Sequence, residues 1–266
     1  MELTDKVAIV TGSGRGIGKG IAKILAKDGA KIIVADMNLD DALKVASEID
    51  DLGSSGTPLR VDVTVQEAVD SMVDSVISKF GQIDILVNNA GIIAAPGWED
   101  RDYHSDEDWN LIYEINVKGI ARVTEAILPH MQSRKYGKIV NIASIAGRIG
   151  SITSGPYSVS KAGVINYTQS TALEQAINSI NVNAVCPGML WTPLWNRIAI
   201  RNGSVQAQYQ GLSARQVFDK YIEEKIPLGR EQTPEDIGNA VAFLASDRSK
   251  NITGQALNVS GGSHFN

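Results

Sequence analysis

The chain contains 266 residues, of which 43% are hydrophobic and 21% are charged, and its formal net charge is −5. These fractions are close to those of soluble globular proteins, so a disordered or fibrous class is excluded. The negative charge argues against nucleic acid or an anionic membrane as the main partner, because both attract basic patches. No stretch approaches the roughly 18 apolar residues of a membrane-spanning helix.

The polar start of the chain, residues 1–6, does not have the apolar core of a secretory signal, so we expect a cytoplasmic protein. The single Cys186 cannot form an internal disulfide. His104, His130 and His264 are far apart in the sequence, without the spacing of metal ligands. We therefore expect neither a metal site nor a thiol nucleophile.

Short apolar segments alternate with longer amphipathic segments, which predicts strands and helices in turn. The first half is expected to hold strands at 6–11, 31–36, 58–63 and 83–88, with helices at 17–27, 40–52 and 66–80. The second half is expected to hold a helix within 106–131, a strand at 138–143, a helix at 157–177, a strand at 181–186, a helix from Thr233 and a strand at 255–259. Nearly continuous apolar strands are typical of a parallel sheet covered on both faces. The pattern predicts one α/β domain over residues 1–266, built as a doubly wound parallel sheet of the Rossmann type.

Residues 190–225 break this alternation, because they mix aromatic and polar side chains between two expected strands. We interpret this insertion as a lid that also lines the substrate pocket, since long insertions of this kind commonly carry function. A segment that contacts another subunit is the alternative.

A glycine-rich turn follows the first expected strand, with Gly12, Gly16 and Gly18 spaced as G-x-x-x-G-x-G. Glycines let the backbone approach a pyrophosphate, which the N-terminus of the following helix attracts. The spacing differs from the strict G-x-G-x-x-G pattern, because Ile17 and Lys19 stand where a third glycine would be needed. A plain tight turn is the alternative to a dinucleotide site.

Asp36 ends the second expected strand, about twenty residues beyond the glycines. A carboxylate there accepts hydrogen bonds from the adenosine ribose and repels a 2′-phosphate, so we predict NAD rather than NADP as the cofactor. Arg15 argues in the opposite direction, since a guanidinium in the turn is able to pair with that phosphate. A strand-end carboxylate on the surface is the alternative interpretation of Asp36.

Tyr157 and Lys161 stand four residues apart in an expected helix, so their side chains lie on one face. A free tyrosine has a pKa of about 10, and a nearby lysine cation lowers that pKa by favouring the phenolate. Such a tyrosine takes a hydroxyl proton while the adjacent carbon gives up its hydride, and it returns the proton in the reverse reaction. Upstream, a buried strand ends at Ser144, at the edge where open α/β sheets bind ligands.

Taken in order, these motifs resemble those of the short-chain dehydrogenase/reductase family along essentially the full chain. The resemblance is carried by Thr11-Gly12-x-x-x-Gly16-x-Gly18, Asn88-Asn89-Ala90-Gly91, Asn116, Ser144, Tyr157-x-x-x-Lys161, and Pro187-Gly188 followed by Thr192. It implies four catalytic residues: Asn116, Ser144, Tyr157 and Lys161. In that set Ser144 hydrogen-bonds the substrate oxygen and Tyr157 transfers the proton. Lys161 lowers the tyrosine pKa and holds the nicotinamide ribose, while Asn116 interrupts its helix to hold a relay water.

The resemblance also implies an NAD site. The residues expected at the cofactor are Gly12, Ser13, Arg15, Gly16, Ile17, Gly18, Asp36, Met37, Asp62, Val63, Asn89, Ala90, Gly91, Tyr157, Lys161, Pro187, Gly188 and Thr192. Asp62 and Val63 are expected at the adenine, and Thr192 at the carboxamide. Ala143 precedes Ser144 where many relatives have a second serine. Ser151, Thr153 and Ser154 are alternatives to Ser144, although they lie too near Tyr157 in the sequence.

The substrate pocket is expected between segments 145–154, 190–225 and 94–98. The residues expected to touch a substrate are Ser144, Ala146, Ser154, Tyr157, Trp191 and Trp195. Residues 191–195 and the Phe265-Asn266 ending are similar to diol, acetoin and sugar-alcohol dehydrogenases of the family, so we predict a polyol, diol or hydroxyketone substrate. An NADPH-dependent 3-oxoacyl-[acyl-carrier-protein] reductase is the nearest alternative, and a non-catalytic nucleotide-binding regulator is a remote one. Family members usually form tetramers through two long helices and the last strand, so we expect a homotetramer.

Overall fold

The structure is a computed structural model and describes residues 2–151 and 153–265. Its centre is a parallel sheet with the strand order β3-β2-β1-β4-β5-β6-β7. The strands are β1 (Val7–Thr11), β2 (Lys31–Asp36), β3 (Gly56–Arg60), β4 (Ile85–Asn88), β5 (Gly137–Ile142), β6 (Ile180–Pro187) and β7 (Ala256–Val259). The order reverses between β1 and β4, and such a reversal opens a ligand-binding crevice at the carboxyl ends of the strands.

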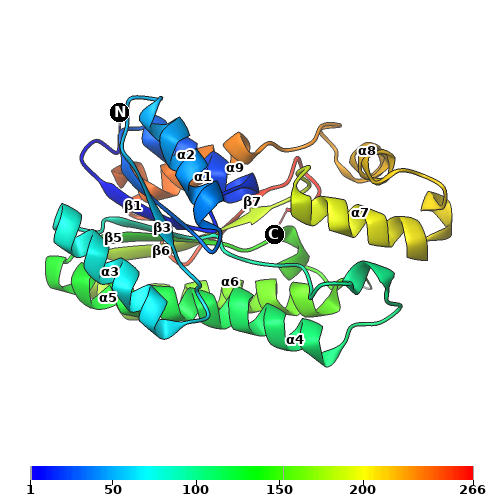
Figure 1. Cartoon of the computed structure of the whole chain (residues 1–266), viewed down its shortest axis with the longest axis horizontal. Coiled ribbons are helices and arrows are strands. Elements are labelled where there is room, and N and C mark those ends of the chain that lie inside the picture. Colours follow the sequence, from blue (N-terminus) through cyan, green and yellow to red (C-terminus); the bar gives the residue numbers. More distant parts are fainter. Residues whose placement is uncertain (1, 152, 266) are drawn as a thin grey trace.

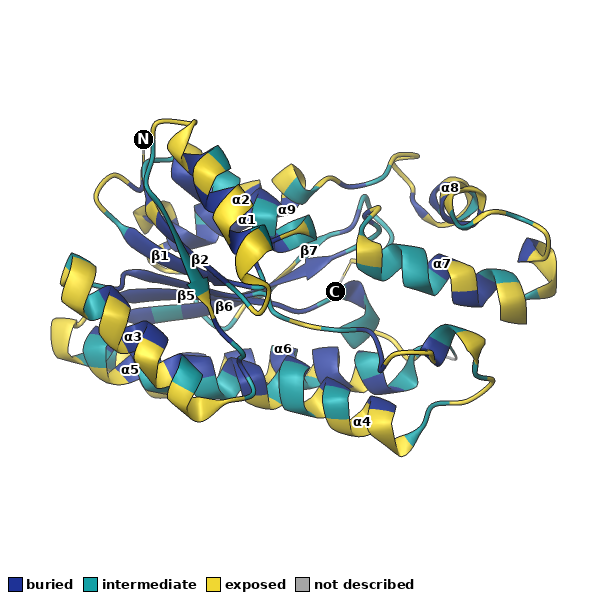
Figure 2. Cartoon of the chain, viewed as in Figure 1, coloured by how far each residue is buried: buried dark blue, intermediate teal, exposed yellow. Residues whose placement is uncertain are grey.

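Helices cover both faces of the sheet (Figure 1). One face carries α1 (Gly16–Lys27), α2 (Leu39–Asp50) and α9 (Pro234–Ala245), and the other carries α3 (Gln66–Phe80), α5 (Gly119–Arg134) and α6 (Gly155–Gln175). Each layer is buried toward the sheet and exposed outward (Figure 2). In β1, Ala8 and Val10 join the apolar cluster of one face, while Val7 and Ile9 join that of the other. This period of two is typical of a strand buried on both faces.

The predicted doubly wound parallel sheet is confirmed. The largest shift among the strands concerns β3, which spans Gly56–Arg60 instead of residues 58–63. Its pairing with β2 ends at Arg60, opposite Asp36, because the chain then leaves the edge of the sheet. Asn266, the last residue of the ending noted above, lies outside the described residues.

The helix expected within 106–131 is interrupted. Helix α4 (Asp106–Tyr113) runs into a π-helical turn, Glu114–Lys118, and the chain continues as α5. Ser105 caps the start of α4, because its hydroxyl accepts a hydrogen bond from the backbone N–H of Asp108 and its own N–H donates to the Asp108 carboxylate.

Residues 190–225 contain two helices, α7 (Pro193–Val205) and α8 (Ala214–Lys225), which extend beyond the carboxyl ends of the strands (Figure 1). Thr192 starts α7 by accepting a hydrogen bond of 3.2 Å from the backbone N–H of Trp195, and Pro193 occupies the first helical position. None of the described helices is long and apolar enough to cross a membrane.

Candidate active site

The glycine-rich turn packs directly against the segment that follows β4. Gly12 has a φ of +63°, and a Cβ on it would lie 2.8 Å from the Cα of Ala90. The Asn89 side chain donates hydrogen bonds of 2.9 Å to the carbonyls of Thr11 and Gly12. Two motifs far apart in the sequence therefore meet here, and a larger residue at Gly12 would be both strained and blocked.

Helix α1 begins at this turn without a side-chain cap. Its N-cap residue, Arg15, has an extended backbone and makes no side-chain capping hydrogen bond, and the first turn contains no acidic residue. The first N–H groups of a helix lack partners within the helix, and the helix dipole adds positive potential there. The turn and the helix end therefore fit the pyrophosphate of a dinucleotide.

Asp36 lies behind the turn. Its Oδ2 accepts a hydrogen bond of 2.8 Å from the backbone N–H of Gly14, and its Oδ1 accepts one of 2.9 Å from that of Asn38. Asp40 and Asp41 begin α2 beside it, and a Cβ on Gly14 would lie 2.8 Å from the Cβ of Asp41. These carboxylates create a negative potential beside the glycine-rich turn.

Other residues expected at the cofactor have varied surroundings. Ser13 is fully buried, and its hydroxyl donates a hydrogen bond of 2.7 Å to the Val10 carbonyl. Because the hydroxyl is already engaged, only the backbone of Ser13 is left to contact a ligand. Ile17 packs against the apolar cluster beneath α1. Arg15 and Met37 are exposed, and both are therefore accessible to a bound nucleotide.

Asp62 and Val63 follow β3 at the same edge of the sheet. The Oδ1 of Asp62 accepts hydrogen bonds from the backbone N–H and the hydroxyl of Thr64, at 2.9 and 2.7 Å. Val63 lines a small cavity together with Thr11 and Ala90. Val63 is thus next to the glycine-rich turn, as expected for a residue of a nucleotide site.

The carboxyl end of β6 lies opposite the turn. Pro187 ends the strand, and a Cβ on Gly188 would lie 2.7 Å from the Cα of Ser260. Thr192 faces the turn, because its Cγ2 lies 3.9 Å from the place of a Cβ on Gly16. The structure therefore brings both ends of the expected cofactor site together.

Asn116 is fully buried in the π-helical turn. Its Oδ1 accepts a hydrogen bond of 2.8 Å from the N–H of Ile92, and its Nδ2 donates one of 2.9 Å to the carbonyl of the same residue. Its Nδ2 also lies 3.2 Å from the hydroxyl of Ser160. The expected interruption of the helix is present, and π turns recur at functional sites.

Lys161 lies beside Asn116 beneath Gly91. A Cβ on Gly91 would lie 3.1 Å from the Oδ1 of Asn116 and 3.6 Å from the Nζ of Lys161. The Nζ donates a hydrogen bond of 2.7 Å to the carbonyl of Ile142, and the lysine is 4% exposed. Burial lowers the pKa of Lys161 to about 8.

Tyr157 lies in the first turn of α6, with its ring centroid 5.6 Å from the Nζ of Lys161. Ser144 follows β5, and its hydroxyl oxygen accepts a hydrogen bond of 3.1 Å from the N–H of Ala146. Burial raises the pKa of Tyr157 to about 12, and interaction with the Ser144 hydroxyl opposes that rise. The phenol is therefore protonated at neutral pH and is ready to act as an acid.

This pKa differs from the expectation that Lys161 lowers it. Loss of solvation is the largest cause at both groups, and it favours the neutral form of each. Burial therefore shifts the two groups in opposite directions, lowering the pKa of Lys161 and raising that of Tyr157. The group that lowers the pKa of Tyr157 in this arrangement is the Ser144 hydroxyl.

An apolar wall adjoins Tyr157. It consists of the buried Ile93, Ala94 and Trp98, with Tyr157, Leu194 and Ile198 packed against them. Segment 94–98 and the start of α7 therefore meet at the tyrosine. Ser154, also expected near a substrate, occupies the N-cap position of α6 without a side-chain capping hydrogen bond, and its hydroxyl lies 2.8 Å from that of Ser151.

The two tryptophans expected in the pocket have different neighbours. The rings of Trp191 and Trp195 meet Phe218 of α8 edge-on, with centroid distances of 5.2 and 5.0 Å. Trp195 also contacts Tyr221, at 5.4 Å. Trp195 therefore joins α7 to α8, and Trp191 joins the segment before α7 to α8. The α7 residues that pack against Tyr157 are Leu194 and Ile198.

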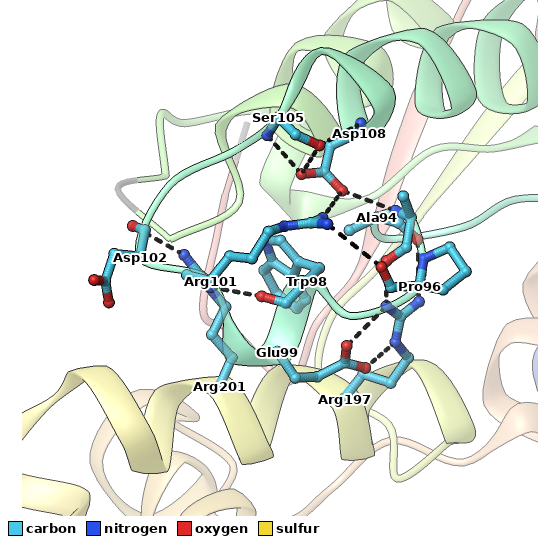
Figure 3. Close-up of polar contacts among 11 residues, drawn as sticks. Ala94, Pro96, Trp98, Glu99, Arg101, Asp102, Ser105, Asp108, Arg197 and Arg201 are labelled. Carbon is cyan, nitrogen blue, oxygen red and sulfur yellow. Dashed lines mark hydrogen bonds and ion pairs between the residues drawn. The ribbon is translucent and has the colours of Figure 1, made fainter.

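Two arginines of α7 were missed by the sequence reasoning. Arg197 and Arg201, one helical turn apart, bind the rim segment, which we define as residues 93–105 (Figure 3). Arg197 pairs with Glu99. The i, i+4 spacing places the two arginines on one face of the helix, and this was the only signal of a shared role in the sequence. Their partners could not be predicted, because most of them are backbone carbonyls.

Comparison with known proteins identifies the family of the chain. A family model described as enoyl-(acyl carrier protein) reductase matches residues 12–264. The chain is 35% identical to a 3-oxoacyl-[acyl-carrier-protein] reductase FabG of Thermotoga maritima, covering 98% of this chain and 99% of that protein.

Solved structures agree in fold along the whole chain. An NAD⁺-bound xylitol dehydrogenase has a TM-score of 0.91 and 36% identity, covering 98% of this chain and 100% of that one. A variant actinorhodin polyketide ketoreductase with NADPH has a TM-score of 0.88 and 34% identity, covering 97% of each chain. With the fold and the motif residues in agreement, this chain belongs to the short-chain dehydrogenase/reductase family and is an oxidoreductase.

Proposed function

We propose that this chain transfers a hydride between NAD(H) and a small secondary alcohol, polyol or diol, or the corresponding ketone. The observation that supports this most strongly is the placement of Tyr157 between the Ser144 hydroxyl and the buried Lys161. The proposed catalytic residues are these three and Asn116.

In this mechanism a bound nicotinamide would supply the hydride acceptor for oxidation of the alcohol carbon and the hydride donor for reduction of the carbonyl carbon. The Ser144 oxygen already accepts a hydrogen bond from Ala146, so its own proton is available for the substrate oxygen. Tyr157 donates its proton to the carbonyl oxygen in reduction and takes the hydroxyl proton in oxidation. Lys161 and Asn116, adjacent beneath Gly91, support a relay that exchanges this proton with solvent through a water held by Asn116.

The protonation state favours reduction at neutral pH. With its pKa raised to about 12, Tyr157 is a proton donor over the whole neutral range. Oxidation requires the phenolate, so its rate rises with pH.

NAD is the proposed cofactor because of the charges behind the glycine-rich turn. Asp36, Asp40 and Asp41 disfavour a 2′-phosphate, whereas the exposed Arg15 favours one. Because three carboxylates outnumber one guanidinium, the local charge is negative, and this supports NAD over NADP. The structural neighbours include one protein with NAD⁺ and another with NADPH, so structural similarity alone does not favour either cofactor.

A compact, uncharged substrate fits the wall beside Tyr157 and the charge around it. Trp98 and Leu194 leave an apolar boundary next to the phenol. Exposed carboxylates continue along the rim segment into α4; they are Asp100, Asp102, Asp106 and Glu107. This acidic border opposes an anionic carrier or a phosphate-bearing thioester.

A second candidate is a 3-oxoacyl-[acyl-carrier-protein] reductase. It is supported by the Thermotoga maritima relative, which matches over nearly the full length of both chains. Arg15 at the turn is the local feature that favours it, through NADPH.

The experiment is an initial-rate assay with polyols, diols, hydroxyketones and β-ketoacyl thioesters, each with NAD(H) and NADP(H), beside Tyr157→Phe. Activity with NAD(H) and a diol, polyol or hydroxyketone, lost in Tyr157→Phe, supports the proposal. Activity confined to NADPH and acyl thioesters supports the second candidate. Activity that survives Tyr157→Phe contradicts the mechanism.

We further propose a cytoplasmic homotetramer with residues 190–225 as its substrate lid. Large apolar side chains are exposed on α4 and α6, among them Trp109, Tyr113 and Leu173. Leu173 is 82% exposed, which supports burial against another subunit. Light scattering coupled to size-exclusion chromatography measures the assembly, and a monomeric mass contradicts it.

A further inference from the structure

The rim segment is held to α7 by hydrogen bonds from a buried cation. Arg201 is 3% exposed, and its guanidinium donates to the carbonyls of Trp98 at 2.7 Å and Asp102 at 3.3 Å, and also to that of Arg101 (Figure 3). Several carbonyls of one short segment thus converge on one guanidinium, whose planar fork suits this geometry. Because the partners are backbone atoms, the arginine sets the path of the chain.

Trp98 connects this arginine with the active site. The Arg201 Cζ lies 4.7 Å from the centroid of the fully buried indole, and the ring of His104 stacks on it at 6.0 Å with an interplanar angle of 19°. The indole belongs to the apolar cluster against which Tyr157 packs. The position of Trp98 therefore depends on Arg201, and the buried indole supports the apolar wall against which the phenol packs.

Further anchors hold the rest of the rim segment in place. Arg197 donates to the carbonyls of Ala94 at 3.1 Å and Ala95 at 2.7 Å. The fully buried Asp108 carboxylate accepts hydrogen bonds from Arg101 at 2.7 Å and from the N–H of Ala95 at 2.9 Å. With both ends of the segment fixed, Trp98 has little freedom to move away from a larger substrate.

We propose that Arg201 is a positioning residue that fixes Trp98 and, through it, the apolar wall of Ile93, Ala94 and Trp98 beside Tyr157, and so restricts the enzyme to compact substrates. This inference rests on the proposed function, because it takes Tyr157 as the group that meets the reacting oxygen. Arg201→Met keeps much of the side-chain length but removes the donors to the carbonyls of Trp98 and Asp102, so the wall loosens. Trp98→Leu reduces the volume of the wall directly, because leucine is smaller than tryptophan, and it leaves the side chain of Arg201 unchanged.

The test compares the reduction of 2,3-butanedione with that of the bulkier 1-phenyl-1,2-propanedione by NADH. In Arg201→Met the ratio of kcat/KM for the phenyl substrate to that for butanedione rises about tenfold, the scale of one relieved apolar contact. The KM for butanedione rises while its kcat and the Kd for NADH stay near the wild-type values. Trp98→Leu raises the same ratio, and Arg201→Lys, which keeps a cation, gives a smaller change than Arg201→Met.

The matched control is Arg248→Met. Arg248 also lies over an aromatic ring, that of Phe243 at 5.5 Å, and pairs with Glu2, but it is exposed and on a different part of the fold. Its removal leaves the substrate ratio unchanged. An equal rise in Arg248→Met, or an unchanged ratio in folded Arg201→Met and Trp98→Leu, overturns the inference.

The two proposals fail separately. If Tyr157→Phe abolishes reduction of both diketones but the Arg201 variants do not alter the ratio, the role of Arg201 is wrong and the proposed function stands. If the wild type turns over none of the alcohols, polyols, diols and ketones with NAD(H), or if Tyr157→Phe retains activity, the proposed function fails. Arg201→Lys and Trp98→Leu keep the inference testable if Arg201→Met does not fold.

Discussion

The backbone N–H of Gly14 donates a 2.8 Å hydrogen bond to the Oδ2 of Asp36, which fixes the carboxylate at the end of β2 against the glycine-rich turn. The other oxygen accepts from Asn38 at 2.9 Å. A charge held in this way cannot turn away from a phosphate placed beside it. The hydrogen bond therefore fixes a negative charge beside the turn that we propose as the pyrophosphate site.

Replacement of this charge is predicted to change the choice of cofactor. Asp36→Asn keeps an oxygen for the Gly14 N–H but removes the negative charge, so the ratio of kcat/KM for NADP to that for NAD should rise about tenfold or more. Steady-state kinetics with both cofactors measure the ratio. Asp70→Asn, an exposed change on α3, is the control. An unchanged ratio in Asp36→Asn would show that Arg15 or another group decides the preference.

The pH dependence of oxidation is predicted to respond to Ser144. The Ser144 hydroxyl opposes the burial that raises the pKa of Tyr157 to about 12, so Ser144→Ala raises this pKa further. Oxidation needs the phenolate, and the rising limb of its pH profile therefore moves to higher pH, with a loss of about 100-fold or more in kcat/KM at pH ~9. Rate profiles between neutral and alkaline pH check this. A limb that stays in place, even with a lower rate, contradicts the assigned role of the hydroxyl.

Asn116 is predicted to stabilise the fold as well as the site. Asn116→Leu leaves the N–H and the carbonyl of Ile92 without their side-chain partners, at about 1–3 kcal/mol for each buried group. The free energy of unfolding in urea measures the loss. Asn110→Leu, on the exposed surface of α4, provides the matched change and should leave stability nearly unaltered. Equal effects of the two substitutions would refute the prediction.

Asp108 is predicted to stabilise the rim segment in a pH-dependent way. Burial alone raises the pKa of Asp108, but hydrogen bonds from the backbone N–H groups of Ser105 and Ala95 outweigh burial and lower it. A carboxyl whose pKa is lowered by folding contributes stability above its unfolded pKa of about 3.9, and this stability is lost as the pH falls through the folded pKa.

Asp108→Asn should therefore lower the free energy of unfolding by about 1–3 kcal/mol at neutral pH, because one charged acceptor is lost. The difference from the wild type should shrink as the pH falls below about 4, where the wild-type carboxyl is protonated in the unfolded chain. Urea titrations at both pH values measure it. A difference of the same size in acid and at neutral pH would rule out the ionised carboxylate as its source.

The fold and the cofactor side of the site could be predicted from the sequence because their signals are local. The glycines from Gly12 to Gly18 allow the tight turn that connects the first strand to the following helix. In a parallel sheet β4 lies next to β1, so Asn89 at the end of β4 reaches that turn. Tyr157 and Lys161 are one helical turn apart, so their proximity depends only on a helix being formed. Segment 94–98 was also placed correctly, beside Tyr157.

The missed features depend on atoms that the sequence does not specify. Arg201 binds carbonyl oxygens, which every residue carries, so its partners follow from the path of the rim segment. The pKa of Tyr157 depends on how much of its surroundings is buried, and this outweighs the neighbouring lysine. The sequence around Trp195 does not indicate which residue its ring contacts. Its contact with Phe218 results from the packing of α7 against α8.

The π-helical turn at Glu114–Lys118 places a constraint on the length of the chain. A π turn holds one residue more than an α turn, so a single deletion there would merge α4 and α5 into one continuous helix. The wide turn absorbs this extra residue, so α4 and α5 keep their facing sides across it. A deletion would therefore remove the bulge that carries the Asn116 amide to the N–H and the carbonyl of Ile92, although the asparagine itself had not changed. The contact with Ile92 thus depends on the number of residues in this turn as well as on the side chain at position 116.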